Sequence, residues 1–147
     1  MIALIQRVKN SWVIVDNKEV AKINKGFNIL LGIMQGDNEE DINKLVKKIV
    51  NMRIFPNEQG KFDKSIQDIN GEILVISQFT LGANIKKGNR PSFSNAMEPN
   101  KAKELYEEFI HKLNQEVPTK AGIFGANMEV GIINDGPVTI IADSKLL

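Results

Sequence analysis

The chain has no cysteine and a single histidine, His111. The missing thiols exclude disulfides, thiolate nucleophiles, iron–sulfur clusters and zinc sites built on cysteine. One imidazole is too few for a His-rich metal site, so we expect no metal. Most general-base mechanisms use His or a perturbed carboxylate. Any chemistry here therefore has to use hydroxyls, carboxylates, amides, backbone groups or the substrate itself.

Long apolar runs and an excess of charge are missing too. The run from Ile29 to Met34 falls far short of the roughly 18 residues that cross a bilayer. The first residues, MIALIQRVKNSW, are interrupted by Gln6 and Arg7 and are followed by no small-residue cleavage site. We expect a cytoplasmic protein without membrane association. The net charge of +1 argues against non-specific coating of nucleic acid but leaves room for a local basic site.

What remains is an ordinary globular composition, 147 residues with 42% hydrophobic and 25% charged, which indicates one domain over residues 1–147. Two segments have helical periodicity: one follows a cap at Asn38, and one runs from about Pro99 to Gln115. We expect an α+β fold, a mainly antiparallel, barrel-like β-sheet with two packed helices. The expected strands are Met1–Val8, Trp12–Val15, Glu19–Ile23, Phe27–Met34, Arg53–Phe55, Glu72–Leu81 and, around a hairpin-like break at Asn134–Pro137, Met128–Ile133 and Val138–Ala142.

The segment from Gly82 to Pro99 follows no regular pattern, and a loop of that length in a compact domain is more often functional than not. It carries Lys86, Lys87 and Arg90, which predict either a solvated charged surface or contacts with nucleic-acid phosphates. His111 is expected at the surface, on the polar face of the second helix. The acidic residues from 37 to 41 suit a helix start and lack the ligand spacing of a calcium loop.

Two segments near strand ends carry groups that could take part in catalysis or ligand binding. Ser77 and Thr80 close an otherwise apolar strand, where hydroxyls are more often turn groups than nucleophiles, which need an activating base. Gly136-Pro137 would ordinarily be a turn, although glycine also lets a ligand approach the backbone closely. The residues alone thus indicate a polar, partly basic site and name no reaction.

Two motifs nonetheless carry a close resemblance to a known family. Ser77-Gln78-Phe79-Thr80-Leu81 and Asn134-Asp135-Gly136-Pro137-Val138-Thr139 resemble those of the D-aminoacyl-tRNA deacylases, also called D-tyrosyl-tRNA deacylases. Asn127 departs from the Asp of many members, and Gly82-Ala83-Asn84 stands where an aromatic residue and Asp are common. The chain ends soon after its last strand, without the extension of some animal members, so no DNA-related role is expected. Further similar segments are Gln6-Arg7-Val8, Arg53-Ile54-Phe55, residues 87–94 and Phe124-Gly125-Ala126-Asn127-Met128.

The resemblance implies a homodimer that acts on aminoacyl-tRNA without a cofactor. It would hydrolyse the ester between a D-amino acid and the terminal adenosine, and glycyl esters as well. Gly136-Pro137 would be cis and would enter the partner subunit's site, where its carbonyls would reject an L side chain. The catalytic segment would be Ser77, Gln78, Phe79 and Thr80.

The roles of individual residues leave alternatives open. Thr80 could attack the ester, or the substrate's 2′-hydroxyl could assist water while backbone N–H groups near Gln78 and Phe79 bind the oxyanion. We favour the second because the sequence offers Thr80 no obvious base. Phe124 and Met128 would pack against the terminal adenine, or they would belong to the core. Arg7 would brace the Gly-Pro loop, or it would form a surface ion pair. Lys86, Lys87 and Arg90 would bind RNA.

Two rival functions compete with this interpretation. A catalytically silent RNA-binding dimer is the alternative, and the intact motifs argue against it. A small-molecule esterase is disfavoured because the chain has no Gly-x-Ser-x-Gly elbow and no partner His.

Overall fold

The computed structural model describes residues 1–147, and its sheet is organised around one long strand, β1 (Ile2–Val15). Along one edge β1 pairs antiparallel with β8 (Glu129–Asp143). Along its other edge it pairs first with β3 (Gly26–Gly32) and then with β2 (Lys18–Ile23), both antiparallel. The two separate strands predicted for this region are wrong. Asn10 and Ser11 continue the strand because they pair with Ile133 and Ile132 of β8.

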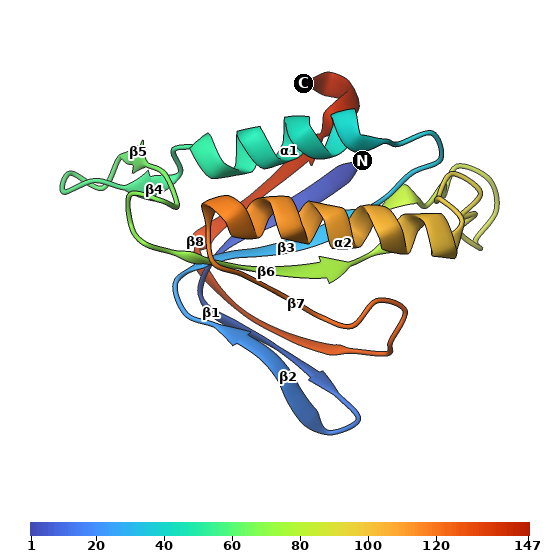
Figure 1. Cartoon of the computed structure of the whole chain (residues 1–147), viewed down its shortest axis with the longest axis horizontal. Coiled ribbons are helices and arrows are strands. Elements are labelled where there is room, and N and C mark those ends of the chain that lie inside the picture. Colours follow the sequence, from blue (N-terminus) through green and yellow to red (C-terminus); the bar gives the residue numbers. More distant parts are fainter.

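The sheet continues in parallel beyond β3. Strand β6 (Glu72–Ser77) pairs with β3, and the short β7 (Thr119–Ala121), which the sequence did not reveal, pairs with β6. The sheet curls until Lys120 Nζ on β7 donates to the Lys22 carbonyl on β2 at 2.8 Å. The resulting sheet is barrel-like and nearly closed (Figure 1), which confirms the predicted fold class. A separate hairpin is formed by β4 (Phe55–Pro56) and β5 (Phe62–Lys64).

Two helices cover one side of the sheet, α1 (Glu39–Asn51) and α2 (Pro99–Glu116) (Figure 1). The predicted cap of α1 is confirmed: Asn38 Oδ1 accepts from the Glu40 N–H at 2.9 Å, and Asp41 Oδ2 accepts from the Asn38 N–H at 2.9 Å. The apolar stripe of α1 is fully buried at Ile42, Leu45 and Ile49. Neither helix combines the length and the apolar character needed to cross a membrane.

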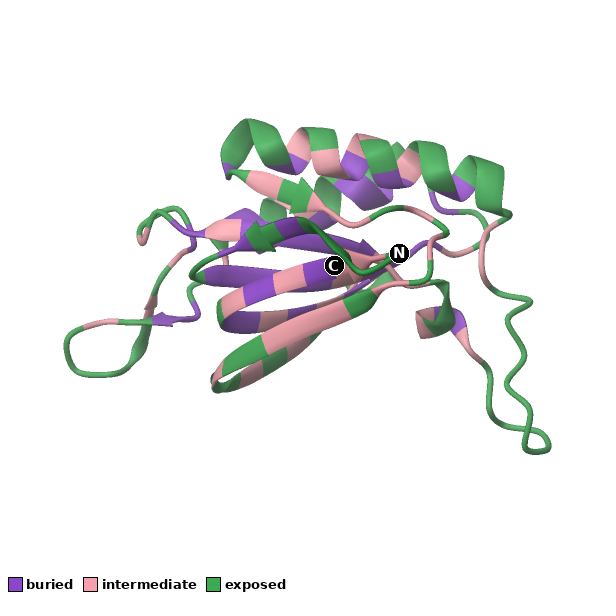
Figure 2. Ribbon diagram, turned by 90° about the horizontal axis from the view of Figure 1, so that it is seen from below, coloured by how far each residue is buried: buried purple, intermediate pink, exposed green.

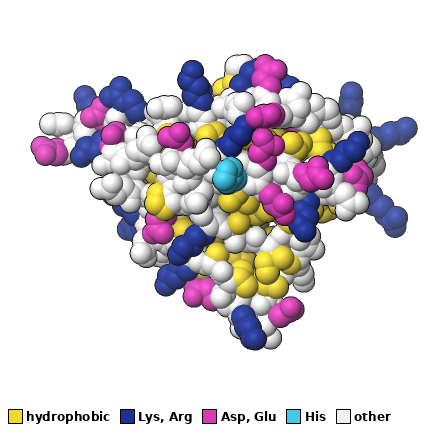
Figure 3. All heavy atoms as spheres, viewed as in Figure 1, with side chains coloured by type: hydrophobic (Ala, Val, Ile, Leu, Met, Phe, Trp, Pro, Cys, Tyr) yellow, Lys and Arg dark blue, Asp and Glu magenta, His cyan; other side chains and the backbone are white.

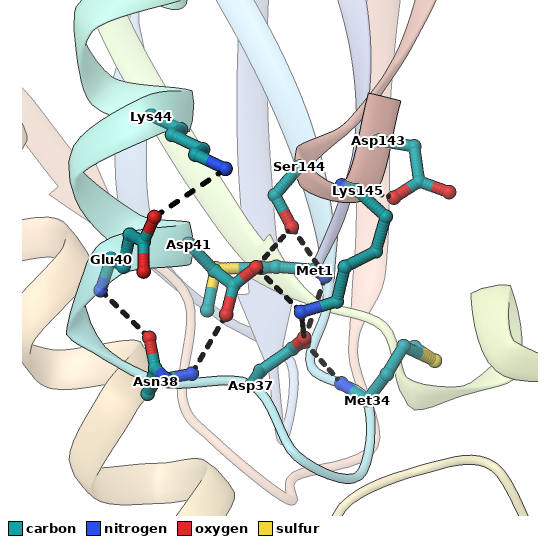
Figure 4. A network of polar contacts seen from close by, with 10 residues as sticks. All are labelled: Met1, Met34, Asp37, Asn38, Glu40, Asp41, Lys44, Asp143, Ser144 and Lys145. Atoms are coloured by element: carbon teal, nitrogen blue, oxygen red, sulfur yellow. Dashed lines mark hydrogen bonds and ion pairs between the residues drawn. The ribbon is translucent and has the colours of Figure 1, made fainter. Parts of the chain in front are cut away.

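A buried charged network ties the chain termini to the start of α1 (Figure 4). The Met1 ammonium lies 2.8 Å from Asp37 Oδ2 and donates to Ser144 Oγ at 2.9 Å. Ser144 begins the short 3-10 helix η2 (Ser144–Leu146), and its hydroxyl donates to Asp41 Oδ1 at 2.7 Å. Lys145 Nζ lies 2.8 Å from Asp41 and 3.4 Å from Asp37. The first and last strands are therefore joined by charge as well as by backbone pairing.

Candidate functional site

A cavity of about 620 Å³ opens at the carboxyl end of β6, beside the start of α2. Its size lies in the range of small-molecule sites. One wall is the segment Ser77–Phe79, and the opposite wall is the segment Phe124–Met128. Apolar side chains gather on this face of the molecule beneath α2 (Figure 3). The remaining lining residues are Leu31, Ile33, Ile76, Phe93, Ala96, Met97, Glu98, Pro99, Ala102 and Val130.

The first wall forms because β6 stops earlier than predicted. Ser77 pairs with Leu31, and the Gln78 N–H donates to the Leu31 carbonyl at 2.8 Å, after which β3 offers no further partner. The chain then turns into the 3-10 helix η1 (Phe79–Gly82) instead of continuing as a strand to Leu81.

The start of η1 leaves two amide protons available. The first N–H groups of a helix have no partner within it, and the Phe79 and Thr80 N–H groups donate to no other group of the chain. The Gln78 N–H is already engaged with Leu31. Within this segment, the Phe79 and Thr80 amides are therefore free to donate to a ligand, whereas that of Gln78 is not.

Thr80 has no general base beside it. Its hydroxyl accepts a hydrogen bond from Gln78 Nε2 at 2.5 Å. The carboxylate that lines the cavity, Glu98, caps α2. Hydrogen bonds from the Asn100 and Lys101 N–H groups keep the pKa of Glu98 below its usual value, which makes it a weak base. His111 lies exposed on α2 beside Gln115, 3.2 Å away, and does not line the cavity.

The mouth of the cavity carries aromatic side chains. Phe79 and Phe93 meet edge to face with centroids 5.2 Å apart and are 57% and 38% exposed. Across the cavity, the Phe124 ring packs on the Tyr106 ring, with the ring centroids 5.5 Å apart. Phe93 and Glu98 could not be singled out from the sequence, because they come from a loop and a helix start that the chain folds back onto β6. No group of three or more His, Asp or Glu side chains is arranged to hold a metal ion.

The second motif does not form the predicted hairpin. On β8, Asn134 pairs with Val8 and Thr139 with Gln6, so four residues, 135–138, face Arg7 alone. We call these four residues the Gly-Pro bulge. Turn-forming residues are here accommodated within one strand because β1 pairs with β8 on both sides of them. The Gly136–Pro137 peptide bond is cis, and both residues are exposed.

Arg7 holds the Gly-Pro bulge from beneath. Its side chain donates to the Asp135 carbonyl at 3.1 Å and to the Ile54 carbonyl at 2.6 Å, and lies 3.4 Å from the Asp135 carboxylate. Arg7 is only 7% exposed, so the alternative of a surface ion pair is wrong. None of the residues of the bulge, nor Arg7, lines the cavity of the same chain.

Lys86, Lys87 and Arg90 lie on an exposed arm between η1 and α2 (Figure 2). The arm is narrowed at its base by paired hydrogen bonds between Asn84 and Ser92, 2.8 and 2.9 Å long. The three cations stand clear of the cavity and do not line it. Phe93, which does line the cavity, lies on the same arm.

Comparison with known proteins finds one family model and relatives that match over the full length of the chain. Residues 4–143 match the family model described as D-Tyr-tRNA(Tyr) deacylase. The chain is 63% identical to a D-aminoacyl-tRNA deacylase of a Nitratiruptor species and 60% identical to one of Persephonella marina, each over 100% of both chains. A solved structure named c-Myc DNA Unwinding Element Binding Protein is 41% identical, with a TM-score of 0.92 over 97% of this chain and 98% of that one.

Proposed function

The chain belongs to the D-aminoacyl-tRNA deacylase family and is a hydrolase, and from that premise we propose that it hydrolyses the ester of D-aminoacyl-tRNA at the cavity beside β6. The products are the free D-amino acid and tRNA. Glycyl-tRNA is a further substrate because glycine presents no side chain to reject. The chain works in the cytoplasm as a homodimer, without a cofactor.

One observation carries the proposal: the two walls of a single cavity offer what the two halves of the substrate need. The free N–H group of Phe79 at the first wall, with that of Thr80 directly after the lining residues, suits the oxygen of an ester that is being attacked. Phe124 and Met128 at the second wall are apolar surfaces of the kind on which a base stacks. Both residues are half-buried, and each also packs against the apolar core.

The proposed mechanism uses the substrate's own 2′-hydroxyl. It assists a water molecule that adds to the ester carbonyl; the ester C–O bond then breaks, and the 3′-oxygen leaves as the hydroxyl of the terminal ribose. The two amides of η1 stabilise the developing oxyanion. Thr80 is not the nucleophile in this mechanism, because no imidazole or carboxylate accepts its proton.

The protein distinguishes D from L substrates by excluding L side chains, with a segment that the partner subunit contributes. Gly136 and Pro137 of the Gly-Pro bulge are exposed. The bulge is held in place by Arg7 and does not line the cavity of its own chain. A partner subunit can place its bulge over the cavity so that the backbone carbonyls face the substrate's α-carbon. An L side chain then collides with this backbone, whereas a D side chain points away. Lys86, Lys87 and Arg90 on the arm contact the tRNA phosphates.

The test is the release of tyrosine from charged tRNA by the purified protein. D-Tyr-tRNA should be hydrolysed and L-Tyr-tRNA spared, with at least about a hundredfold difference in rate, the discrimination that a steric clash of a few kcal/mol gives. Binding of both tRNAs with release of neither amino acid would favour the non-catalytic RNA-binding dimer instead.

Replacing Thr80 separates the two mechanisms. Thr80→Ala should slow D-Tyr-tRNA hydrolysis by no more than about tenfold, the effect of one lost hydrogen bond. Replacing the terminal adenosine by its 2′-deoxy form should cost about a hundredfold or more, because the assisting hydroxyl is gone. Single-turnover rates measure both effects, and Thr80→Ser serves as the matched control. An acyl-Thr80 adduct trapped during turnover would establish Thr80 as the nucleophile.

A further inference from the structure

Tyr106 is a buried phenol that no step of the proposed reaction uses. It lies in α2 and is 3% exposed. Its hydroxyl lies 3.1 Å from the carbonyl oxygen of Val75 and 3.3 Å from that of Gly122. Burial raises the pKa of the Tyr106 hydroxyl far above its usual value, so the group remains a hydrogen-bond donor throughout the neutral range.

These two carbonyls mark the point where β6 and β7 separate. Val75 and Ala121 are the last pair of their ladder, and the Gly122 N–H donates to the Val75 carbonyl at 3.0 Å. Beyond this fork, defined by Val75 and Gly122, one branch runs to Ser77 and the other to Phe124, and each branch becomes one wall of the cavity. The Tyr106 hydroxyl thus binds both branches where the cavity begins to open.

The second wall of the cavity, Phe124–Met128, packs against residues at the same fork. The Tyr106 ring packs on Phe124 with a tilt of 49° between the ring planes. Gly122 has no side chain at a position where a Cβ would lie 2.7 Å from Met128 Sδ. Phe124 and Met128 are therefore placed by contacts with Tyr106 and with the glycine to which Tyr106 is bonded.

We propose that Tyr106 is a positioning residue for the nucleoside end of the substrate: its hydroxyl sets the spacing of the two walls, and its ring sets the place of Phe124. The proposal rests on the proposed function, which assigns the adenine to the second wall. Tyr106 touches no reacting atom, so its loss affects the binding of the substrate and not the chemical step.

The experiment compares the wild type with Tyr106→Phe, which keeps the ring and removes the hydroxyl. Ser144→Ala is the matched control, because it also removes a fully buried hydroxyl that bonds two groups but lies away from the cavity. KM for D-Tyr-tRNA should rise about three- to tenfold in Tyr106→Phe while kcat stays within about twofold. The dissociation constant of adenosine 5′-monophosphate, measured by calorimetry, should rise by a similar factor. Ser144→Ala should change neither quantity.

The possible results test the role of Tyr106 separately from the proposed function. Unchanged KM and unchanged nucleotide affinity in Tyr106→Phe, equal changes in Ser144→Ala, or no binding of adenosine 5′-monophosphate to the wild type would each overturn the role of Tyr106. A wild-type protein that releases no D-tyrosine contradicts the proposed function instead. The nucleotide measurement still decides the role of Tyr106 in that case, because it requires no hydrolysis.

Discussion

Two inactive variants of this chain should restore each other's activity when their subunits are mixed. The first, Gly136→Ala, disturbs the Gly-Pro bulge. Gly136 has φ +126°, which L side chains rarely adopt, and a Cβ there would lie 2.9 Å from Val138 Cγ2 and 3.1 Å from Arg7 Nη2. The bulge must shift, and its carbonyls would then leave the place that the proposed contact with a partner's cavity requires. We expect about 1–3 kcal/mol of strain from this substitution.

The second variant, Phe79→Pro, removes one of the two proposed oxyanion donors. Phe79 is the first residue of η1, where the fixed φ of proline is tolerated. Loss of one such donor typically costs about a hundredfold to a thousandfold in kcat. Phe79→Ala is the control, because it removes the same ring and keeps the N–H. It should be far more active than Phe79→Pro.

Subunit exchange then gives heterodimers with one site built from two intact halves and one built from two damaged halves. Random mixing in equal amounts should restore about a quarter of the wild-type activity, since half the dimers are mixed and each has one good site. D-Tyr release is measured after exchange has been verified by mass spectrometry of differently tagged subunits. Exchange without recovered activity would show that each site is made within one subunit.

Asp37→Asn should be the most destabilising single acid-to-amide change in the chain. Asp37 has no exposed side-chain surface and lies 2.8 Å from the equally buried Met1 ammonium. Removing one partner of a buried pair leaves the other charge uncompensated, which costs about 3–5 kcal/mol. Urea unfolding measures the change. Glu40→Gln is the matched control, because Glu40 meets Lys44 at 3.6 Å on the surface, and such pairs contribute about 0.5 kcal/mol or less.

Because of the same network, the free energy of unfolding should depend on pH in the acid range. Burial alone would raise the pKa of Asp41, but hydrogen bonds from Lys145, Ser144 and the Asn38 N–H bring it well below its usual value. A carboxyl with a lowered folded-state pKa stabilises the fold above its unfolded pKa, near 3.9, and loses that contribution as the pH falls further. The free energy of unfolding should therefore drop below about pH 4. Asp41→Asn should flatten this dependence, and an unchanged acid slope would contradict the assignment.

The helices could be predicted because their signals are local. Asn38 as a cap and the apolar stripe of Ile42, Leu45 and Ile49 depend on neighbours within two turns of helix. The family motifs likewise directed attention to the end of β6, where the cavity opens. What could not be predicted depends on pairing between distant strands. Residues 134–137 have the composition of a turn, and only the register of β8 against β1 makes residues 135–138 a bulge.

The lining of the cavity was also only partly predictable. Nothing in the order of the residues brings Phe93 or Glu98 next to Ser77, because the loop that carries them has no periodicity to follow. The engaged amide of Gln78 could not be anticipated either, since it depends on where β3 ends. The length of β6 is set by its partner strand, whereas its β-branched and aromatic composition favoured four more residues of strand.

Strand β1 is synthesised long before β8, the strand that completes its edge. Ala3 pairs with Ala142, and the Met1 ammonium bonds to Ser144. Contacts between such distant residues make folding slow. At about 5–20 residues per second of synthesis, the nascent chain spends several seconds with the unpaired edge of a long apolar strand exposed. Such an edge is a template for intermolecular pairing, so the yield of native protein should depend on translation speed and on chaperones that cover β1 until β8 emerges.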